Sequence, residues 1–302
     1  MKMTDVLLAL VVALCWGFNF VVIKVGLDSF PPILFSALRF ACAAFPAVLI
    51  WGRAGIQWRW ILSIGVILGT IMFTLLFVGM HLGMPAGLSS IVLQVQVVFT
   101  LILSGVVLRD RPAAWQTAGI AIAFAGIAVL ILDRYETASF AGMLFVIGSG
   151  FAWAVANILM KQCGSIDMFR LMIWMSLVPP VPLVLVSLIF EEGQAAALAD
   201  ISLSGWGAIL YTGLISTVLA YSLWGKLFQR YSPNVVAPFA LLVPVFGILS
   251  SVVVLNESLS VFELIASCLV LTGLFFVLYG VKISKFWFNF RGTLSEKRER
   301  RV

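Results

Sequence analysis

Residues 4–27, TDVLLALVVALCWGFNFVVIKVGL, form an apolar run long enough to cross a lipid bilayer as one helix. A bilayer core about 30 Å thick needs about 20 helical residues to span it. The run continues past Cys15 for a full membrane width and contains no convincing small-x-small cleavage site. We therefore interpret it as a transmembrane helix and not as a signal peptide.

Further runs of the same kind fill the chain almost end to end. The ten predicted spans cover residues 4–27, 31–51, 58–80, 85–108, 113–132, 140–160, 169–190, 203–226, 233–255 and 259–281. The composition agrees, because 62% of the residues are hydrophobic and 11% are charged, whereas a soluble domain carries roughly 25% charged residues. The sequence predicts an all-α integral membrane protein.

The basic residues predict which side of the membrane the two ends face. An even number of spans puts both termini on one side. With a cytoplasmic N-terminus, the inner loops and ends contain Lys2, Arg53, Arg59, Arg109, Arg111, Lys161, Arg170, Lys226, Arg230 and the basic tail 282–302. The outer segments keep only Lys24 and Arg134. Because cytoplasmic loops carry an excess of Lys and Arg, we expect an inner-membrane protein with both termini in the cytoplasm.

Residue types needed for catalysis or metal binding are scarce. His81 is the only histidine, and the cysteines fall singly, without a C-x-x-C pair. One histidine makes neither a zinc site nor a Ser-His-Asp triad, and no phosphate-binding Gly-x-x-x-x-Gly-Lys loop is present. We expect no catalytic residue, metal or cofactor. The basic residues are scattered over short loops, so we expect membrane lipids as partners of the tail and no nucleic acid.

The two halves of the chain resemble each other along their length. Trp16 and Lys24 match Trp153 and Lys161 at the same spacing. Further matches, in order, are Pro85 with Pro233, Asp110 with Glu257, and Gly126 with Gly273. Five spans are an odd number, so the second copy enters the membrane from the opposite side, as in transporters whose substrate site lies between inverted repeats. We expect five-helix repeats at residues 1–137 and 138–281.

Several segments resemble a known family. They are WGFNFVVIKVG at 16–26, LRF at 38–40 with Pro46, GMPAGLSSIVLQVQ at 83–96 and LLVPVFG at 241–247. They resemble the ten-helix EamA-type transporters of the drug/metabolite transporter superfamily, and within it the bacterial exporters of O-acetylserine and cysteine. The resemblance implies two inverted five-helix bundles around a central cavity, export from the cytoplasm, and small amino-acid metabolites as substrates. Asp110 departs from the Glu that relatives usually have there.

Polar residues inside the spans mark the candidate cavity, because polar side chains in hydrocarbon usually face the bundle interior. Trp16 and Asn19 share one face of the first span, and Trp153 and Asn157 share one face of the sixth. Asparagine offers both a donor and an acceptor, which suits the ammonium and carboxylate of a zwitterion. Hydrogen bonding between helices is the alternative role.

Two glutamines give the strongest functional signal. Gln94 and Gln96 lie near the middle of the fourth span, where a purely structural helix would gain from apolar residues. Polar stripes in the third and eighth spans add Thr74 and Tyr221 to the candidate substrate-binding residues.

Arg39 is the one strongly charged residue deep in a span, about 12 Å from the outer end of its helix. It can hold a substrate carboxylate with two hydrogen bonds, or tie the second helix to its neighbours. The LRF pattern belongs to the family whatever the substrate, which favours the structural role.

Proline and glycine predict bends and close contacts. Pro46 and a cluster that begins at Pro179 lie in the second and seventh spans, where they act as hinges or as fixed bends. Gly65-x-x-x-Gly69 and Gly79-x-x-x-Gly83 in the third span allow close helix approach.

These patterns predict a secondary transporter that exports small neutral amino-acid metabolites by alternating access, as a monomer or a homodimer. Efflux of amphipathic cationic drugs is the alternative within transport, but it needs a buried carboxylate, and Asp5 and Glu263 lie near helix ends. A membrane scaffold or lipid scramblase is the alternative outside transport. The sequence leaves the coupling ion open.

Overall fold

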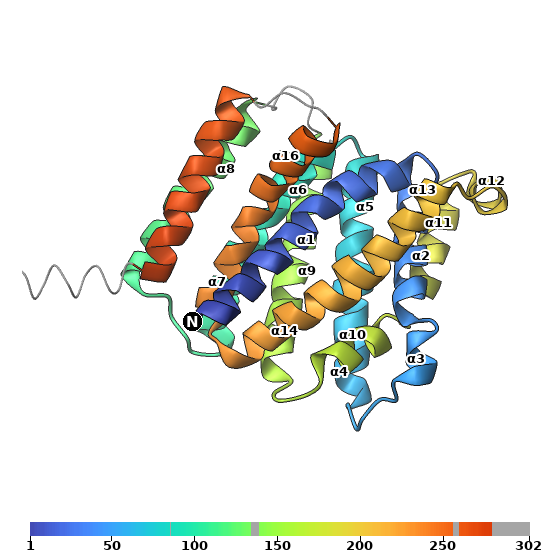
Figure 1. Cartoon of the computed structure of the whole chain (residues 1–302), viewed down its shortest axis with the longest axis horizontal. Helices are drawn as coiled ribbons and strands as arrows, with labels where there is room; N and C mark the ends of the chain where they lie inside the picture. Colours follow the sequence, from blue (N-terminus) through green and yellow to red (C-terminus); the bar gives the residue numbers. More distant parts are fainter. Residues whose placement is uncertain (85, 134–138, 256–259, 280–302) are drawn as a thin grey trace, which may run out of the picture.

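The computed structural model is helical throughout the parts of the chain that it describes, residues 1–84, 86–133, 139–255 and 260–279 (Figure 1). Within these residues, eight helices are long and apolar enough to cross a membrane. A further pair, Met168–Met175 and Pro180–Phe190, is bent by 41° at its break, and Ala114–Val129 is a shorter apolar helix. The all-helical class is confirmed and the chain is a multi-pass membrane protein, while the count of ten spans stays a prediction.

The helices follow one another without strands in the described residues. The first half contains α1 (Met3–Leu27), α2 (Pro32–Ala44), α3 (Ala47–Ile50), α4 (Trp58–Ile64), η1 (Gly65–Met72), α5 (Phe73–His81), α6 (Ala86–Val92), η2 (Leu93–Val95), α7 (Gln96–Val107) and α8 (Ala114–Asp133). The second half contains α9 (Phe140–Gln162), α10 (Met168–Met175), α11 (Pro180–Phe190), α12 (Gln194–Ala199), α13 (Leu203–Leu210), η4 (Tyr211–Leu219), α14 (Ala220–Arg230), α15 (Pro233–Val236), η5 (Ala237–Leu241), α16 (Leu242–Leu255) and a last helix, Val261–Tyr279.

Irregular helix segments recur at matching places in the two halves. The third predicted span contains the π-helical segment η1, and the eighth contains the π-helical segment η4. The fourth contains the 3₁₀ segment η2, and the ninth contains the 3₁₀ segment η5. Such segments rotate the residues that follow them relative to a regular helix and often occur at functional sites.

Glycines set the closest helix contacts. A Cβ on Gly17 would come within 2.8 Å of the backbone of α16, which lies along α1. A Cβ on Gly79 would come within 2.8 Å of a carbonyl of α9, which lies along α5. Gly65 and Gly69 pack in the same way against the bend between α10 and α11, where Pro179 lies. The predicted small-residue contacts are confirmed at Gly65, Gly69 and Gly79.

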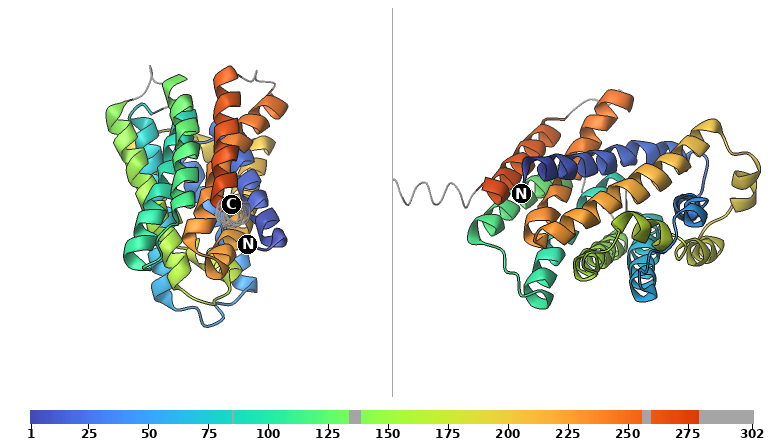
Figure 2. Two further views of the ribbon diagram at one scale, coloured as in Figure 1. Left: turned by 90° about the vertical axis from the view of Figure 1, so that its left-hand side faces the viewer. Right: turned by 60° about the horizontal axis from the view of Figure 1, so that its bottom comes forward.

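Two helices form a separate pair at one flank of the bundle. α8 lies beside the helix Val261–Tyr279 in all three views (Figures 1 and 2). Gly126 makes the approach possible, because a Cβ there would come within 2.7 Å of the Ala266 carbonyl oxygen. α8 reaches the rest of the bundle mainly through α6.

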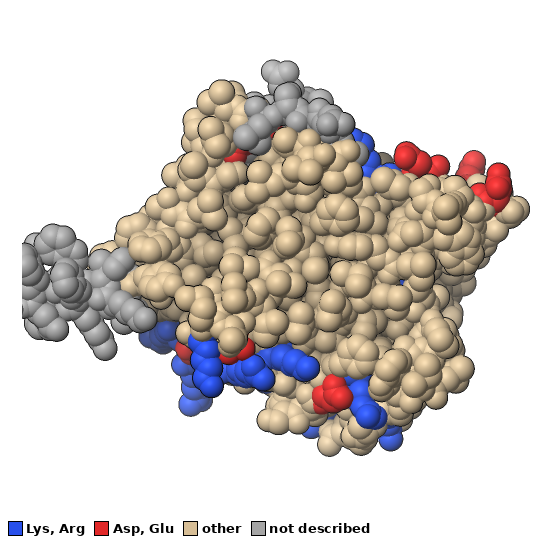
Figure 3. Space-filling model, viewed as in Figure 1, with Lys and Arg blue, Asp and Glu red and all other residues tan. Residues whose placement is uncertain are grey.

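Charged side chains gather at two opposite edges of a largely apolar surface (Figure 3). Lys and Arg predominate along one edge, which also holds the N-terminus and the connections from α3 to α4 and from α9 to α10 (Figure 1). Asp and Glu gather at the other edge, near α12. We call these the basic edge and the acidic edge. An apolar band between two charged edges is the surface that a bilayer selects.

Candidate functional site

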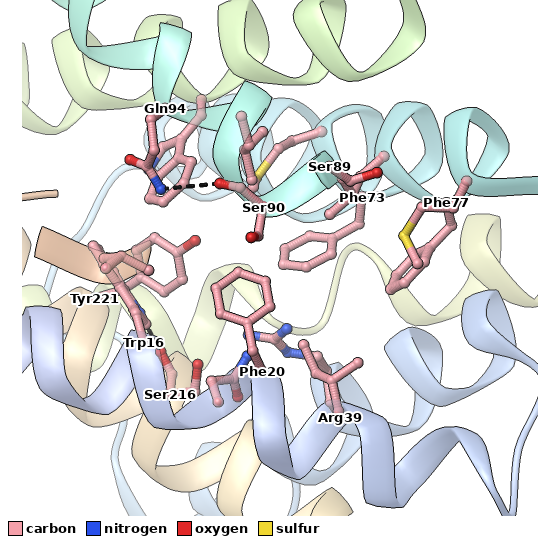
Figure 4. A pocket seen from close by; sticks show the side chains of 18 residues that line it. Trp16, Phe20, Arg39, Phe73, Phe77, Ser89, Ser90, Gln94, Ser216 and Tyr221 are labelled. Atoms are coloured by element: carbon pink, nitrogen blue, oxygen red, sulfur yellow. Dashed lines mark hydrogen bonds between the residues drawn. The ribbon is translucent and has the colours of Figure 1, made fainter. Parts of the chain in front are cut away.

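A cavity lies inside the bundle, between helices of both halves (Figure 4). Its walls come from α1, α2, η1, α5, α6 and η2 in the first half, and from α9, η4, α14 and α16 in the second. Aromatic and aliphatic side chains make most of the wall, among them Phe20, Phe73 and Phe77. A mostly apolar cavity with a few polar groups is the usual form of a small-molecule site.

Most of the candidate residues named from the sequence line this cavity. They are Trp16, Asn19, Arg39, Gln94, Trp153 and Tyr221. Thr74, Gln96 and Asn157 do not line it. Thr74 is half-buried on α5, and its hydroxyl has no hydrogen-bond partner among the described residues. The cavity also includes Ser216, which helical periodicity missed because it lies in the π-helical segment η4.

Gln94 points into the cavity with half of its amide unused. Its side chain is 1% exposed, and its Nε2 donates to the carbonyl oxygen of Ser90, one turn earlier, at 3.3 Å. Its Oε1 has no hydrogen-bond partner among the described residues. In Figure 4, Gln94 and Ser90 lie on one wall, and Phe20 and Arg39 lie on the opposite one. A free acceptor therefore faces the space between the walls.

Three further polar atoms on lining residues are buried without a partner. They are Asn19 Oδ1, Ser89 Oγ and Trp153 Nε1. Leaving a buried donor or acceptor unsatisfied costs about 1–3 kcal/mol, so such atoms are rare in a core that exists only to be stable. Other such atoms, among them Ser36 Oγ, Gln96 Nε2 and Ser104 Oγ, lie away from the cavity, but at the cavity a polar ligand or water can complete the hydrogen bonds.

Arg39 brings a buried positive charge to the same cavity. The residue is 3% exposed, and its Nε and Nη2 donate to Thr217 Oγ1 at 3.0 and 2.8 Å. Its guanidinium also lies over the ring of Phe73, 4.6 Å from the centroid. Within the described part of the chain it forms no ion pair with an acid. A buried cation without an anion is costly, so the site favours an anionic group.

Asn157 and Gln96 lie instead in a buried network that joins α7, α9 and α14. Asn157 Nδ2 donates to Gln96 Oε1 at 3.0 Å and to Thr100 Oγ1 at 3.1 Å. Asn157 Oδ1 accepts from Trp224 Nε1 at 3.1 Å. All four residues are 0% exposed. The structure thus gives these two amides the contacts of helix-to-helix hydrogen bonding, the alternative role noted for them.

An aromatic layer separates the cavity from this network. The ring of Trp16 lies 5.3 Å from Trp153, 4.7 Å from Tyr221 and 5.1 Å from Trp224, measured between centroids. Trp16, Trp153 and Tyr221 line the cavity, and Trp224 belongs to the network. Trp16 Nε1 donates to the Ser216 carbonyl at 3.1 Å, which fixes the indole in place. The layer closes this end of the cavity.

Beyond the network, polar contacts join the helix ends at the basic edge. The Asp5 carboxylate accepts from Arg230 Nη1 at 2.8 Å and from the Tyr231 hydroxyl at 2.6 Å. Lys161 Nζ donates to the Tyr231 carbonyl at 3.0 Å. These contacts, which we call the basic-edge clasp, hold the ends of α1, α9 and α14 together.

A second cavity, more open to the surface, adjoins the other end of the central cavity, because Phe77 and Met80 line both. It continues past Asp28 and Glu191, between the α1–α2 turn and the end of α11. Glu191 accepts from the backbone N–H groups of Ile33 and Leu34 at 2.6 and 3.0 Å, which ties α11 to the start of α2. The second cavity therefore lies between the central cavity and the acidic edge.

Comparisons with known proteins agree with this architecture. The model of the EamA-like transporter family matches residues 3–132 and 140–279. The chain is 36% identical over 293 residues to a probable amino-acid metabolite efflux pump of Escherichia coli, covering 94% of this chain and 98% of that protein. It is 26% identical to YedA, an uncharacterized inner membrane transporter of the same bacterium, over 83% of each chain.

A protein of known crystal structure has the same fold, with a TM-score of 0.77 at 20% identity over 91% of this chain and 96% of its own. The family model covers most of the chain in two consecutive segments, and the E. coli pump aligns almost from end to end. This multi-pass membrane protein therefore belongs to the EamA-like transporter family.

Proposed function

We propose that this chain exports small neutral amino-acid metabolites, such as O-acetylserine and cysteine, across the inner membrane. One observation carries the proposal: a buried arginine without an acidic partner shares a cavity with the unsatisfied oxygens of Asn19 and Gln94. The similarity to a probable amino-acid metabolite efflux pump supports it.

The wall groups suit the two charges of a zwitterion. Arg39 and the Trp153 indole N–H are donors for a carboxylate, since an arginine–carboxylate hydrogen bond is charge-assisted. The oxygens of Asn19, Gln94 and Ser89 are acceptors for an ammonium group. The aromatic walls then take a short uncharged side chain.

The same groups disfavour cationic drugs. No acidic side chain stands among the described residues that line the cavity, and Arg39 repels a second positive charge there. Asp5, which lies near a helix end, is engaged in the basic-edge clasp.

The proposal includes ten spans in two inverted repeats, 1–137 and 138–281, with both termini and the tail 282–302 in the cytoplasm. Irregular segments at matching places in the two halves support the repeat, as do the two consecutive family matches. The separation of the basic and acidic edges supports the orientation, because Lys and Arg concentrate on the cytoplasmic side (Figure 3).

In this orientation the aromatic layer lies between the central cavity and the cytoplasm, and the second cavity lies between it and the outside, which suits an outward-facing state. Export then requires a second state in which the basic-edge clasp releases and the aromatic layer around Trp16 separates. The segments η1, η2, η4 and η5 are suited to bending, because their hydrogen bonds already depart from the regular helix. This is alternating access between two packings of the same repeats.

Transport into inside-out membrane vesicles tests the proposal. We expect vesicles that contain the wild-type chain to accumulate labelled O-acetylserine or cysteine, and an excess of either unlabelled solute to compete. The Arg39→Lys variant keeps a positive charge but loses the forked donor pair, so we expect at least about tenfold weaker uptake at an unchanged protein level. The matched control Arg170→Lys changes an arginine at the basic edge that pairs with Asp167.

The export proposal would be refuted if empty vesicles and vesicles with the wild-type chain took up every amino-acid metabolite of a panel equally. Uptake by Arg39→Lys equal to that of the wild type would refute the role of Arg39 alone.

A further inference from the structure

A groove separate from the central cavity runs between α7 and α8, on the flank where α8 pairs with the last helix (Figure 1). It is open to the surface and shares no lining residue with the central cavity. Val98, Ile102 and Val106 of α7 face Ile120 and Phe124 of α8 across it. Ile102 and Val106 are 54% and 74% exposed, so this part of the α7 wall is not packed against protein, whereas Ile120 of α8 is buried.

The length of the groove matches the thickness of the hydrocarbon part of one leaflet. Its wall on α7 runs from Val98 to Arg109, which corresponds to about 16 Å at 1.5 Å per residue. One leaflet contributes half of a hydrocarbon core that is about 30 Å thick. Gly105 adjoins open space in the groove, because a Cβ at this position would meet no atom within 4 Å.

Two arginines stand at one end of the groove. Arg109 and Arg111 both line it and are both exposed. Neither side chain has an ion-pair or hydrogen-bond partner among the described residues. Arg109 follows the end of α7 in the left-handed conformation, with φ of 55°, and the Asp110 N–H donates to the Ser104 carbonyl at 3.1 Å. The end of α7 is thus held by its own backbone, and both guanidinium groups are free for a ligand.

We propose that this groove binds one anionic phospholipid, with an acyl chain between α7 and α8 and the phosphate between Arg109 and Arg111. The apolar groove is about as long as one acyl chain and ends at two unpaired cations. It therefore matches the acyl chain and the phosphate of such a lipid in chemistry and in spacing. Arginine forms paired hydrogen bonds to phosphate oxygens, and basic pockets between membrane helices hold anionic head groups on the cytoplasmic side. The leaflet follows from the proposed topology, but the site does not depend on the transported substrate.

Retention of lipid by the purified full-length protein tests the site. The protein in mild detergent is incubated with phosphatidylglycerol or with phosphatidylcholine of the same acyl chains, and bound lipid is counted by native mass spectrometry. We expect about one phosphatidylglycerol per chain to survive detergent washing, and a rise in the melting temperature that phosphatidylcholine does not produce. Short-chain dihexanoyl phosphatidylglycerol has the head group without long chains, and we expect it to be washed away.

Two variants probe the two ends of the groove separately. Arg109→Gln/Arg111→Gln removes the charge, and Gly105→Leu puts a side chain into the apolar part, at a position where a Cβ meets no atom within 4 Å. We expect each to reduce phosphatidylglycerol retention at least about fivefold while the protein stays folded. The matched controls are Arg53→Gln/Arg59→Gln in another loop of the basic edge, and Gly207→Leu in α13, where a Cβ also meets nothing within 4 Å. Both controls should retain the lipid as the wild type does.

Several outcomes would overturn the proposal. Equal retention of phosphatidylcholine would show an apolar surface without head-group recognition. Wild-type retention in both groove variants would place the lipid elsewhere. The wild type could also prove to be a dimer that Gly105→Leu converts to a monomer, with lipid retention unchanged. That result would show that a second copy of the chain covers the groove.

Discussion

Identical side chains have different roles in this bundle, according to what their polar atoms contact. Gln94 and Gln96 are two residues apart, yet the Gln94 oxygen is unsatisfied at the cavity. The Gln96 oxygen instead accepts from Asn157 in the buried network, and only the Gln96 Nε2 lacks a partner among the described residues. The same contrast separates Trp153, whose indole N–H is unpaired, from Trp224, whose N–H is bound to Asn157. A group with a partner stabilises the fold, and one without a partner is available to a ligand.

Replacing each glutamine by leucine should separate the two roles. We expect Gln94→Leu to cut transport at least about tenfold at normal expression and thermal stability, because it removes a group worth about 1–3 kcal/mol in recognition. We expect Gln96→Leu to lower the melting temperature, because Asn157 loses an acceptor in the core. Vesicle uptake and a thermal melt of the purified protein measure both effects. Loss of stability in Gln94→Leu, with none in Gln96→Leu, would reverse the assignment.

The two tryptophans allow the same comparison on the donor side. Trp153→Phe removes an unpaired N–H and keeps an aromatic ring in the layer, so we expect a KM for transport raised roughly five- to tenfold and little change in stability. Trp224→Phe removes a donor that Asn157 uses, so we expect a loss of about 1–3 kcal/mol in stability. Concentration-dependent uptake and denaturation curves measure these quantities. An unchanged KM in Trp153→Phe would exclude its N–H from the site.

At the scale of elements, irregular helices and one cluster of helix ends define the conformation. The π-helical segments η1 and η4 and the 3₁₀ segments η2 and η5 supply or adjoin the cavity wall. The basic-edge clasp around Asp5 holds α1 to α14 on the far side of the aromatic layer. Bending at these segments and release of the clasp are together suited to changing which edge the cavity faces.

Weakening the clasp should open the cavity toward the basic edge. In a variant without native cysteines, Ser89→Cys serves as a probe on the cavity wall. We expect Asp5→Asn to raise its labelling by a membrane-impermeant maleimide several-fold in inside-out vesicles, because a hydrogen-bonded charge pair is lost. The control Asp167→Asn removes a pair within one helix of the same edge and should not change labelling. Equal labelling with and without Asp5→Asn would show that the clasp does not control access.

At the scale of the whole molecule, the apolar band and its charged edges determine how the chain sits in a bilayer. Lys and Arg predominate at one edge, and Asp and Glu gather at the other (Figure 3). The second cavity, which adjoins the central one, lies at the acidic edge. For an exporter with the proposed orientation, this arrangement would correspond to the state that faces outward.

Topology reporters measure the orientation directly. We expect fusions in the loops at Arg53, Arg109, Arg170 and Arg230 to report the cytoplasm, and a fusion after Glu192 to report the outside, because the Lys and Arg excess marks the inner loops. The C-terminus should report the cytoplasm as well. A C-terminus on the outside would contradict both the orientation and an even number of spans.

The sequence by itself determined the class of fold and much of the cavity. Long apolar runs leave the backbone no partner in lipid but itself, so they must be helical. Polar residues at helical spacing then identified Trp16, Asn19 and Arg39 as residues of the interior, and these line the cavity. Both results follow from local pattern, because the bilayer constrains every segment in the same way.

Only the tertiary structure decided which interior groups have partners. Periodicity put Gln94, Gln96 and Asn157 among the same candidates, but Gln96 and Asn157 meet each other through the packing of α7 on α9, while Gln94 faces open space. The hydroxyl of Thr217, far from Arg39 in sequence, is likewise its neighbour through packing. The π-helical and 3₁₀ segments further limit what the sequence predicts, because they change the helical phase that a 3.6-residue pattern assumes. Contacts between distant segments therefore determine the role of each polar side chain in the interior.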